Sequence, residues 1–293
     1  MKVLVGGGRG FIGSAVCRLL QKRGHDWTII SRTSGPKTIS WSELKKNGLQ
    51  ECDAIINLSG ENAYNPMKRW NEGFKKEVIS SRVEITSDIA KLISEANNPP
   101  KVFVSASAVG YYAPSTTVEY TEESPPGNDF FARLSVDWEN AAKLAESNET
   151  RVAIVRIGVV LGKDGGAIQQ MKLPFLIGVG GVIGSGDQFF PWIHVDDAAG
   201  IFVHAVENNQ VKGILNGTAP GVTTNRDFTK AYASALWRPS IFPVPGFVIK
   251  MMVGSERASL VLEGQNVQPK RTLDSGYEFK YTNLADALKN IVG

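Results

Sequence analysis

The chain of 293 residues has few cysteines and histidines: two cysteines, Cys17 and Cys52, and three histidines. No CxxC pair occurs, and no histidine has a carboxylate or cysteine at metal-ligand spacing, so we expect neither a disulfide framework nor a metal site. The longest apolar runs fall short of the ~18 to 20 residues that span a bilayer, and the N-terminus does not resemble a signal peptide. We therefore expect a reducing compartment, the cytoplasm, and no membrane partner.

An excess of one charge sign is also missing, because 32 basic residues stand against 29 acidic ones and the formal net charge is +3. Without a basic run, this balance argues against a nucleic-acid partner. Hydrophobic residues make up 42% of the chain, which is enough for a sizeable core. The length suits one large α/β unit or two joined lobes, and the oligomeric state stays open.

Short β-branched runs alternate with longer amphipathic stretches in the first half of the chain. Strands are expected at 2–5, 27–30, 54–58, 101–105 and 152–156, and helices at 11–23, across most of 67–96 and around 133–146. This alternation predicts an α/β fold with a doubly wound parallel sheet of the Rossmann type. Glycine-rich and aromatic segments at 178–194 indicate a change of pattern. We expect a dinucleotide domain over 1–160 and a smaller, intimately joined substrate lobe with a mostly helical tail over 161–293.

The segment Gly6-Gly-Gly-Arg-Gly-Phe-Ile-Gly13 follows the first expected strand and precedes a helix. Its glycines permit a tight turn and close approach of a pyrophosphate, and the helix N-terminus offers free N–H groups. A glycine-rich turn without a ligand is the alternative. The residues expected to bind the cofactor here are Gly7, Arg9, Gly10, Phe11, Ile12 and Gly13.

The end of the second strand indicates which dinucleotide is bound. An NAD site usually has Asp or Glu there, whereas this chain has Ser31 and Arg32. A guanidinium matches a phosphate, which a carboxylate would repel, so NADP is favoured. Arg9 and Lys37 would add positive charge. The alternative is that Arg32 is an ordinary solvated residue.

With these residues in place, the chain resembles the extended short-chain dehydrogenase/reductase superfamily, and more narrowly its atypical branch of epimerase family proteins. The resemblance runs over essentially the whole length. Besides the glycine loop it rests on five motifs, which are Asn57-Leu-Ser-Gly-Glu-Asn62, Ser105-Ala-Ser-Ala-Val-Gly-Tyr-Tyr112, Arg156-Ile-Gly-Val-Val-Leu-Gly162, Phe190-Pro-Trp-Ile-His-Val-Asp-Asp197 and Glu263-Gly-Gln-Asn-Val-Gln-Pro269.

The resemblance also implies further cofactor contacts. Leu58 and Ser59 would flank the adenosine or its ribose, and Val160 would lie close to the nicotinamide end. Glu77 and Arg82 would stand on a helix beside the cofactor, although both would also pass as ordinary solvated helix charges.

The usual catalytic groups of the superfamily are a serine and a Tyr-x-x-x-Lys pair on the next helix. Ser107 stands at the serine position, but Phe131 holds the tyrosine position and Ser135 the lysine position. Tyr111 and Tyr112 are therefore the candidate acids, unless both are packing groups. The WIHVDD segment is expected to be structural, with Asp196 or Asp197 capping a helix.

Two functions remain in view. The first is an NADP-dependent oxidoreductase or epimerase that acts on a small carbonyl or hydroxyl substrate, which the glycine loop and Ser107 favour. The second is an idle NADP(H)-binding sensor or partner-binding protein, which Phe131 and Ser135 favour. The residues do not identify the substrate.

Overall fold

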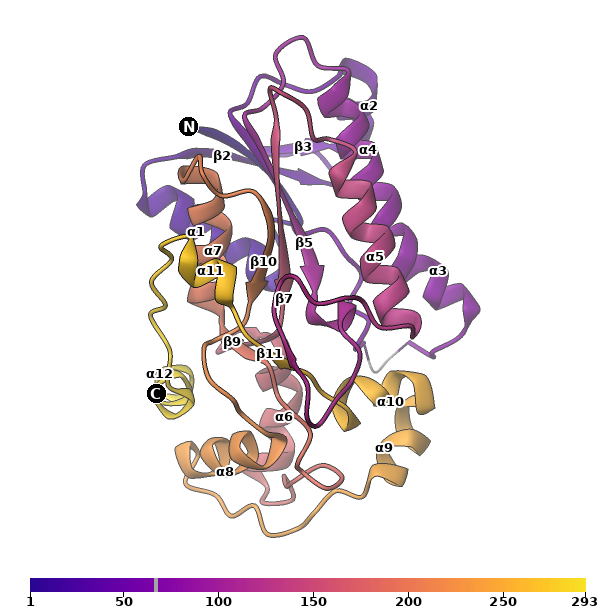
Figure 1. Cartoon of the computed structure of the whole chain (residues 1–293), viewed down its shortest axis with the longest axis vertical. Helices are drawn as coiled ribbons and strands as arrows, with labels where there is room; N and C mark the ends of the chain where they lie inside the picture. The colour runs from indigo at the N-terminus through magenta and orange to yellow at the C-terminus, as the bar shows by residue number, and fades with distance from the viewer. Residues whose placement is uncertain (66–67) are drawn as a thin grey trace.

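The computed structural model of the chain describes residues 1–65 and 68–293, and a seven-stranded sheet forms its centre (Figure 1). The strand order is β10-β7-β5-β4-β1-β2-β3, and every neighbouring pair is parallel. The strands are β1 (Lys2–Gly6), β2 (Asp26–Ser31), β3 (Thr38–Ser40), β4 (Ala54–Asn57), β5 (Val102–Ala108), β7 (Arg151–Ile157) and β10 (Gly213–Gly217). This confirms the predicted doubly wound α/β fold.

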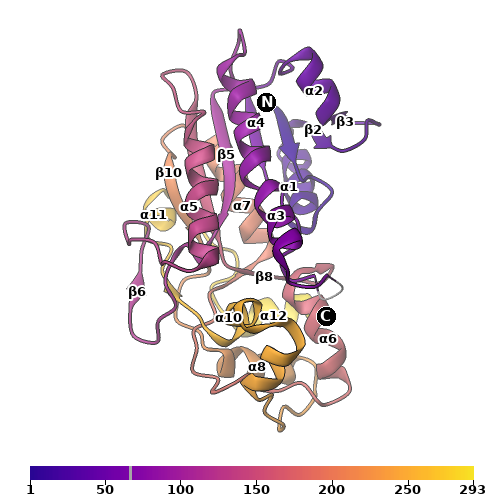
Figure 2. The ribbon, with the colours of Figure 1, turned by 90° about the vertical axis from the view of Figure 1, so that its right-hand side faces the viewer.

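Helices cover both faces of the sheet, as Figures 1 and 2 show. One layer holds α1 (Phe11–Lys22) and α7 (Val195–Glu207), and the other holds α2 (Trp41–Asn47), α4 (Val83–Ser94) and α5 (Phe130–Lys143). Adjacent residues of β4 serve opposite layers, because Ile55 packs with one core and Ile56 with the other. Burial on both sides explains why the strands are continuous apolar runs rather than alternating ones.

The helix expected over 67–96 is two helices. Residue 67 lies outside the described residues, and the chain then forms α3 (Glu72–Ser80) and α4, with Ser81 and Arg82 between them.

The order of the strands reverses beside β1. From β1 the chain adds β2 and β3 on one side, and it then crosses to place β4 on the other. The carboxyl ends of β1 and β4 therefore border the crevice where open α/β sheets bind ligands.

The second half of the chain forms a lobe at the carboxyl end of the sheet and has its own core, which includes Phe175, Phe228 and Leu288. Its elements are β8 (Val159–Gly162), α6 (Gly166–Leu176), β9 (Trp192–His194), α8 (Asn225–Ala235), α9 (Gly246–Val253), α10 (Ser255–Leu262) and α12 (Leu284–Val292). The remaining elements are the 3-10 turn η1 (Val109–Tyr111), β6 (Glu119–Tyr120), β11 (Asn266–Val267) and α11 (Lys270–Asp274).

The expected boundary at residue 160 falls inside β8, and both α7 and β10 return to the sheet after it. The sheet thus takes elements from both sides of that residue. Within the described ranges, no helix has the length and apolar character needed to cross a membrane.

The start of α7 differs from the expectation. His194 is the N-cap, and its Nδ1 accepts a hydrogen bond from the Asp196 N–H at 3.1 Å. The prediction that Asp196 or Asp197 caps this helix is wrong, because the helix already begins at Val195. The Asp197 carboxylate instead accepts the backbone N–H groups of Lys280 (2.7 Å) and Tyr281 (2.9 Å), which fastens the C-terminal tail to α7.

Candidate functional site

The glycine loop joins β1 to α1 at the point where the strand order reverses. Gly7 has a φ of +73°, in the left-handed region, and the Gly10 N–H donates to its carbonyl at 2.9 Å. A Cβ on Gly7 would lie 2.5 Å from the Leu58 carbonyl oxygen, and one on Gly13 would lie 2.2 Å from the Gly7 carbonyl oxygen. Only glycine fits at these two positions, since the obstructing atoms belong to the backbone.

Gly10 is different, because a Cβ there would meet a single atom within 4 Å, the Gly7 carbonyl oxygen at 3.2 Å. It is the exposed N-cap of α1, whose first turn carries neither a side-chain cap nor an acidic residue. The first N–H groups of a helix have no partner within it. The loop is therefore a cradle that an anionic group such as a pyrophosphate fits.

Two arginines stand near the end of β2. Arg32 is exposed and makes no hydrogen bond or ion pair with any residue in the described ranges, and the Arg9 Nη2 donates to Thr38 Oγ1 at 3.4 Å. The Ser31 hydroxyl closes a local turn by donating to the Thr33 carbonyl at 3.0 Å. Arg32 thus follows β2 directly, and Arg9 contacts the neighbouring strand β3 at Thr38.

Lys37, the third cation expected here, is already engaged. Its Nζ lies 3.7 Å from the Asp26 carboxylate and 4.8 Å from the centre of the Trp27 ring. These contacts leave Arg9 and Arg32 as the better candidates for a phosphate.

The loop after β4 lies against the glycine loop. The Leu58 N–H donates to the Gly6 carbonyl at 2.9 Å, and both Leu58 and Ser59 are half-buried. Asn57 is fully buried, and its side chain accepts the Ser59 N–H (3.1 Å) and donates to Thr86 Oγ1 (2.9 Å). Sequence reasoning assigned no role to Asn57, although an amide at the end of an apolar strand is a visible signal.

Arg82 and Glu77, both expected beside the cofactor, lie in different surroundings. The Arg82 guanidinium packs against Gly60 in the loop after β4 and donates to the Val78 carbonyl at 3.2 Å. Burial lowers its pKa to about 10, which leaves it charged at neutral pH. Glu77 is exposed on α3, where its carboxylate pairs with Lys68 at 2.6 Å.

Phe11 and Val160 connect the glycine loop to the turn after β8. Three glycines surround the Phe11 ring, because a Cβ on Gly162 or Gly165 would lie 2.7 or 2.6 Å from it, and Gly166 is similar. Val160 is buried in β8 opposite Ile193, while Ile12 is half-buried against the same core. The start of α1 is thereby held against the second lobe.

Ser107 belongs to a buried charged network. It is 2% exposed, and its hydroxyl donates to Glu139 Oε1 at 2.8 Å. The same carboxylate accepts two hydrogen bonds from Arg156, from Nε at 2.7 Å and from Nη2 at 2.9 Å. Sequence reasoning gave these two residues no role, although a lone arginine within the apolar strand 152–157 is a signal for a buried partner.

Both candidate tyrosines contact Arg156 of that network. Tyr112 is fully buried, and its hydroxyl donates to Asn216 Oδ1 (2.7 Å) and accepts from Arg156 Nη1 (2.8 Å). Burial raises the pKa of Tyr112 to about 12, against the opposing effect of the neighbouring guanidinium. Tyr111 is only half-buried, and the Arg156 guanidinium carbon lies 3.3 Å from the centre of its ring. Of the two tyrosines, only Tyr111 therefore keeps appreciable solvent-exposed surface.

The positions of the missing catalytic pair are filled by packing groups. Phe131 is buried and stacks on Trp70, with ring centroids 5.7 Å apart and planes 29° apart. The Ser135 hydroxyl donates to the Phe131 carbonyl of its own helix at 2.8 Å. Neither side chain is placed to exchange a proton with a ligand.

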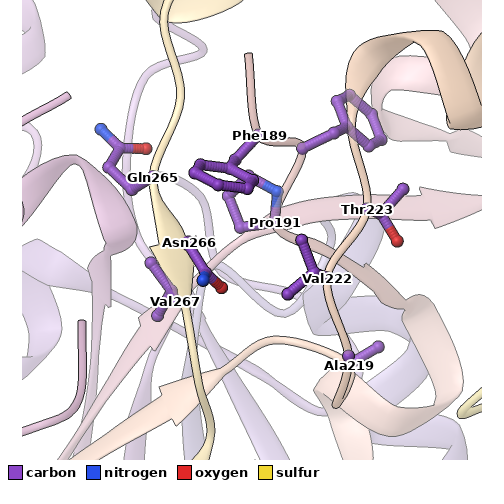
Figure 3. A pocket seen from close by; sticks show the side chains of 10 residues that line it. Phe189, Pro191, Ala219, Val222, Thr223, Gln265, Asn266 and Val267 are labelled. Carbon is purple, nitrogen blue, oxygen red and sulfur yellow. The ribbon is translucent and has the colours of Figure 1, made fainter. Parts of the chain in front are cut away.

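Residues 189–191, in the aromatic segment before β9, line a very small cavity (Figure 3). In this view Phe189 and Pro191 lie between residues 265–267 on one side and residues 219–223 on the other, around a volume of about 10 Å³. This space has room for about one water molecule and is too small for a substrate. A larger hollow of about 340 Å³ opens between the starts of α8 and α12, and neither hollow is lined by the glycine loop.

Comparison with known protein families gave two matches. Residues 3–216 match the NAD dependent epimerase/dehydratase family, and residues 244–291 match a domain of unknown function (DUF1731). The chain is 53% identical to human epimerase family protein SDR39U1, with both chains covered completely. It is 34% identical to epimerase family protein YfhF of Bacillus subtilis, over 100% of this chain and 98% of that protein.

Solved structures are similar over the whole chain. The crystal structure of human SDR39U1 (isoform 2) with NADPH superimposes with a TM-score of 0.98 at 52% identity and covers 100% of this chain and 99% of that one. A nucleoside-diphosphate sugar epimerase from Corynebacterium glutamicum gives a TM-score of 0.81 at 29% identity, over 100% of this chain and 58% of that one.

Proposed function

Because the chain belongs to the NAD dependent epimerase/dehydratase family, we propose that it binds NADP(H) and catalyses oxidoreduction of a small carbonyl or hydroxyl compound. One observation carries the choice of cofactor: Arg32 and Arg9 stand near the end of β2, where an NAD site would have a carboxylate. The human relative with 52% identity was crystallised with NADPH, which supports the same choice.

We assign the phosphate-binding roles as follows. The loop of Gly7, Gly10 and Gly13 would receive the pyrophosphate against the first N–H groups of α1, at Phe11 and Ile12. Arg32 and Arg9 would pair with the 2′-phosphate, beside Ser31.

The two nucleoside parts of the cofactor would meet further residues. Leu58 and Ser59 would border the adenosine half, with Arg82 against the same loop. Val160 would close the nicotinamide end. Glu77 is a weaker candidate for a cofactor contact, because its carboxylate already pairs with Lys68.

Tyr111 is our candidate for proton transfer. When bound, NADP(H) supplies or accepts the hydride. In a reduction the substrate carbonyl oxygen would take the proton of the Tyr111 hydroxyl, and water would then return a proton to the phenolate. Ser107 and Tyr112 would act indirectly, since both bind the network that holds the Arg156 guanidinium over the Tyr111 ring.

The replacement Arg32→Ala tests the cofactor assignment. Losing a charge-assisted phosphate contact should weaken NADPH by about 1.5 to 3 kcal/mol, or roughly 10- to 150-fold in Kd, and should leave NADH almost unchanged. Isothermal titration calorimetry of both nucleotides measures this. Lys37→Ala is the matched control, because Lys37 already pairs with Asp26. Equal losses for NADPH and NADH in Arg32→Ala would refute the assignment.

A second function, NADP(H) binding without turnover, is favoured by Phe131 and Ser135 in place of the usual tyrosine and lysine. A panel of aldehydes, ketones and quinones, followed by loss of NADPH absorbance, separates the two functions. Turnover that Tyr111→Phe abolishes supports the enzyme. Tight NADPH binding without turnover on any compound supports the idle protein.

A further inference from the structure

The helix α9 lies on the surface with an apolar sequence, Gly246-Phe-Val-Ile-Lys-Met-Met-Val253. None of its eight residues is buried, and Phe247, Met251 and Met252 are 66%, 79% and 74% exposed. Surface helices normally turn an apolar stripe toward the core. This helix leaves Phe247, Met251 and Met252 exposed, while Val248, Ile249 and Val253 are half-buried.

The chain that leads into α9 continues the same surface. Trp237, two residues after the end of α8, is 90% exposed and has a φ of +54°, which is unfavourable for a bulky residue. Ile241 and Phe242 follow and are 75% and 64% exposed. Figure 1 shows this connection running along the lower end of the molecule from α8 to α9.

The end of α6 adds a third segment, with Leu173 and Ile177 both about two-thirds exposed. It lies beside the connection, because the Arg238 Nε donates to the Leu176 carbonyl at 3.1 Å and the Val244 N–H donates to the Val182 carbonyl at 2.8 Å. Residues 173–179 and 237–252 thus form one exposed apolar surface, which we call the apolar end.

The size of the apolar end exceeds what a monomer ordinarily exposes. Ten of the sixteen large hydrophobic side chains that are exposed in the described ranges belong to it. An aromatic ring alone buries about 150 to 250 Å² when covered, so the ten expose on the order of 1,000 Å², against the few hundred Å² of an ordinary surface patch.

The charges around the apolar end decide what covers it. Residues 165–186 and 231–255 contain Lys172, Arg238 and Lys250 and no Asp or Glu, although acidic residues make up 29 of the 293 in the chain. In a symmetric dimer this surface would face its own copy, and its cations would find no carboxylates within these two segments; the flanking Asp187 and Glu256 already pair with Arg226 and Lys75. A surface that combines exposed Trp, Phe and Met with cations alone complements an anionic lipid bilayer.

We propose that the apolar end docks on the surface of a membrane that contains anionic lipids. Trp237, Phe242 and Phe247 enter the boundary between headgroups and acyl chains, while Lys172 and Lys250 contact lipid phosphates. Such docking needs no spanning segment, so the shortness of the apolar runs does not oppose it.

Flotation with vesicles of phosphatidylcholine, with and without phosphatidylglycerol, tests the proposal. The full chain should bind the anionic vesicles, and high salt should weaken binding. A triple variant with Phe247→Ser, Met251→Ser and Met252→Ser should lose binding about tenfold or more. Leu144→Ser is the matched control, because Leu144 is 69% exposed just after α5, far from the apolar end.

A charge variant, Lys172→Glu with Lys250→Glu, keeps the apolar side chains and should also lose binding about tenfold, whereas Lys143→Glu should not. Circular dichroism establishes that each variant is folded. Two results would overturn the proposal. One is that the parent does not bind anionic vesicles, or that the variants bind them as tightly as the parent does. The other is a parent that sediments as a dimer that the triple variant breaks, since the apolar end would then face a second copy.

Discussion

The replacement Glu139→Gln should destabilise the protein strongly, because it leaves a buried guanidinium without its counterion. Glu139 and Arg156 are each 3% exposed and share two hydrogen bonds of 2.7 and 2.9 Å. Glutamine has the same shape but no charge. Its amide keeps one acceptor oxygen, while its NH₂ group would face a guanidinium N–H or the Ser107 hydroxyl.

The size of the effect follows from that burial. Breaking a buried ion pair by removing one partner costs about 3 to 5 kcal/mol, out of a total stability of about 5 to 15 kcal/mol. An unfolding entropy of about 2.1 cal/mol/K per residue, over 293 residues, amounts to about 0.6 kcal/mol per kelvin. The Tm should therefore fall by about 5 to 8 °C.

Thermal unfolding followed by calorimetry and circular dichroism, without nucleotide, measures the loss. Glu146→Gln is the control, because Glu146 is an exposed carboxylate just beyond the same helix, and its Tm should stay close to that of the parent. The double replacement Glu139→Leu with Arg156→Met should cost less than Glu139→Gln, since it removes both charges. A Glu139→Gln Tm within about 1 °C of the parent would refute the reasoning.

Three further outcomes are expected. Gly10→Val should stay folded, because its Cβ meets only one protein atom within 4 Å. It should lose NADPH binding in calorimetric titration, because its methyl groups enter the space of the pyrophosphate. Retained tight binding would contradict this. Gly13→Val should lower the Tm sharply, since its Cβ would lie 2.2 Å from the Gly7 carbonyl oxygen, and a Tm like that of the parent would show that the loop can move aside. Burial lowers the pKa of His194, and its Nδ1 must stay unprotonated to cap α7. Below about pH 6.5 the unfolded state therefore binds more protons than the folded state, and the free energy of unfolding should fall as the pH drops. His194→Asn keeps a capping oxygen without titrating, so urea unfolding between about pH 7 and pH 5 should show a shallower loss than in the parent; an unchanged slope would exclude this histidine as the cause.

The fold could be predicted because the patterns that indicate it lie between residues close together in the chain. A glycine loop between an apolar strand and an amphipathic helix involves residues that are neighbours in the chain, and so does the alternation that predicts parallel strands. The preference for NADP could likewise be predicted from Arg32, because its place at the end of β2 follows from the local strand pattern. The absence of the catalytic pair needed only the identities of Phe131 and Ser135 in a helix.

The tertiary structure alone decided which of the candidate groups are open to a ligand. Tyr111 and Tyr112 are neighbours in one motif, yet Tyr112 is enclosed by Arg156 and Asn216, which lie 44 and 104 residues away in the chain. His194 caps its helix, against the sequence expectation, because the exact start of a helix depends on how the chain arrives there. Burial and hydrogen-bond partners depend on contacts between distant segments, and the sequence pattern of a single segment does not predict them.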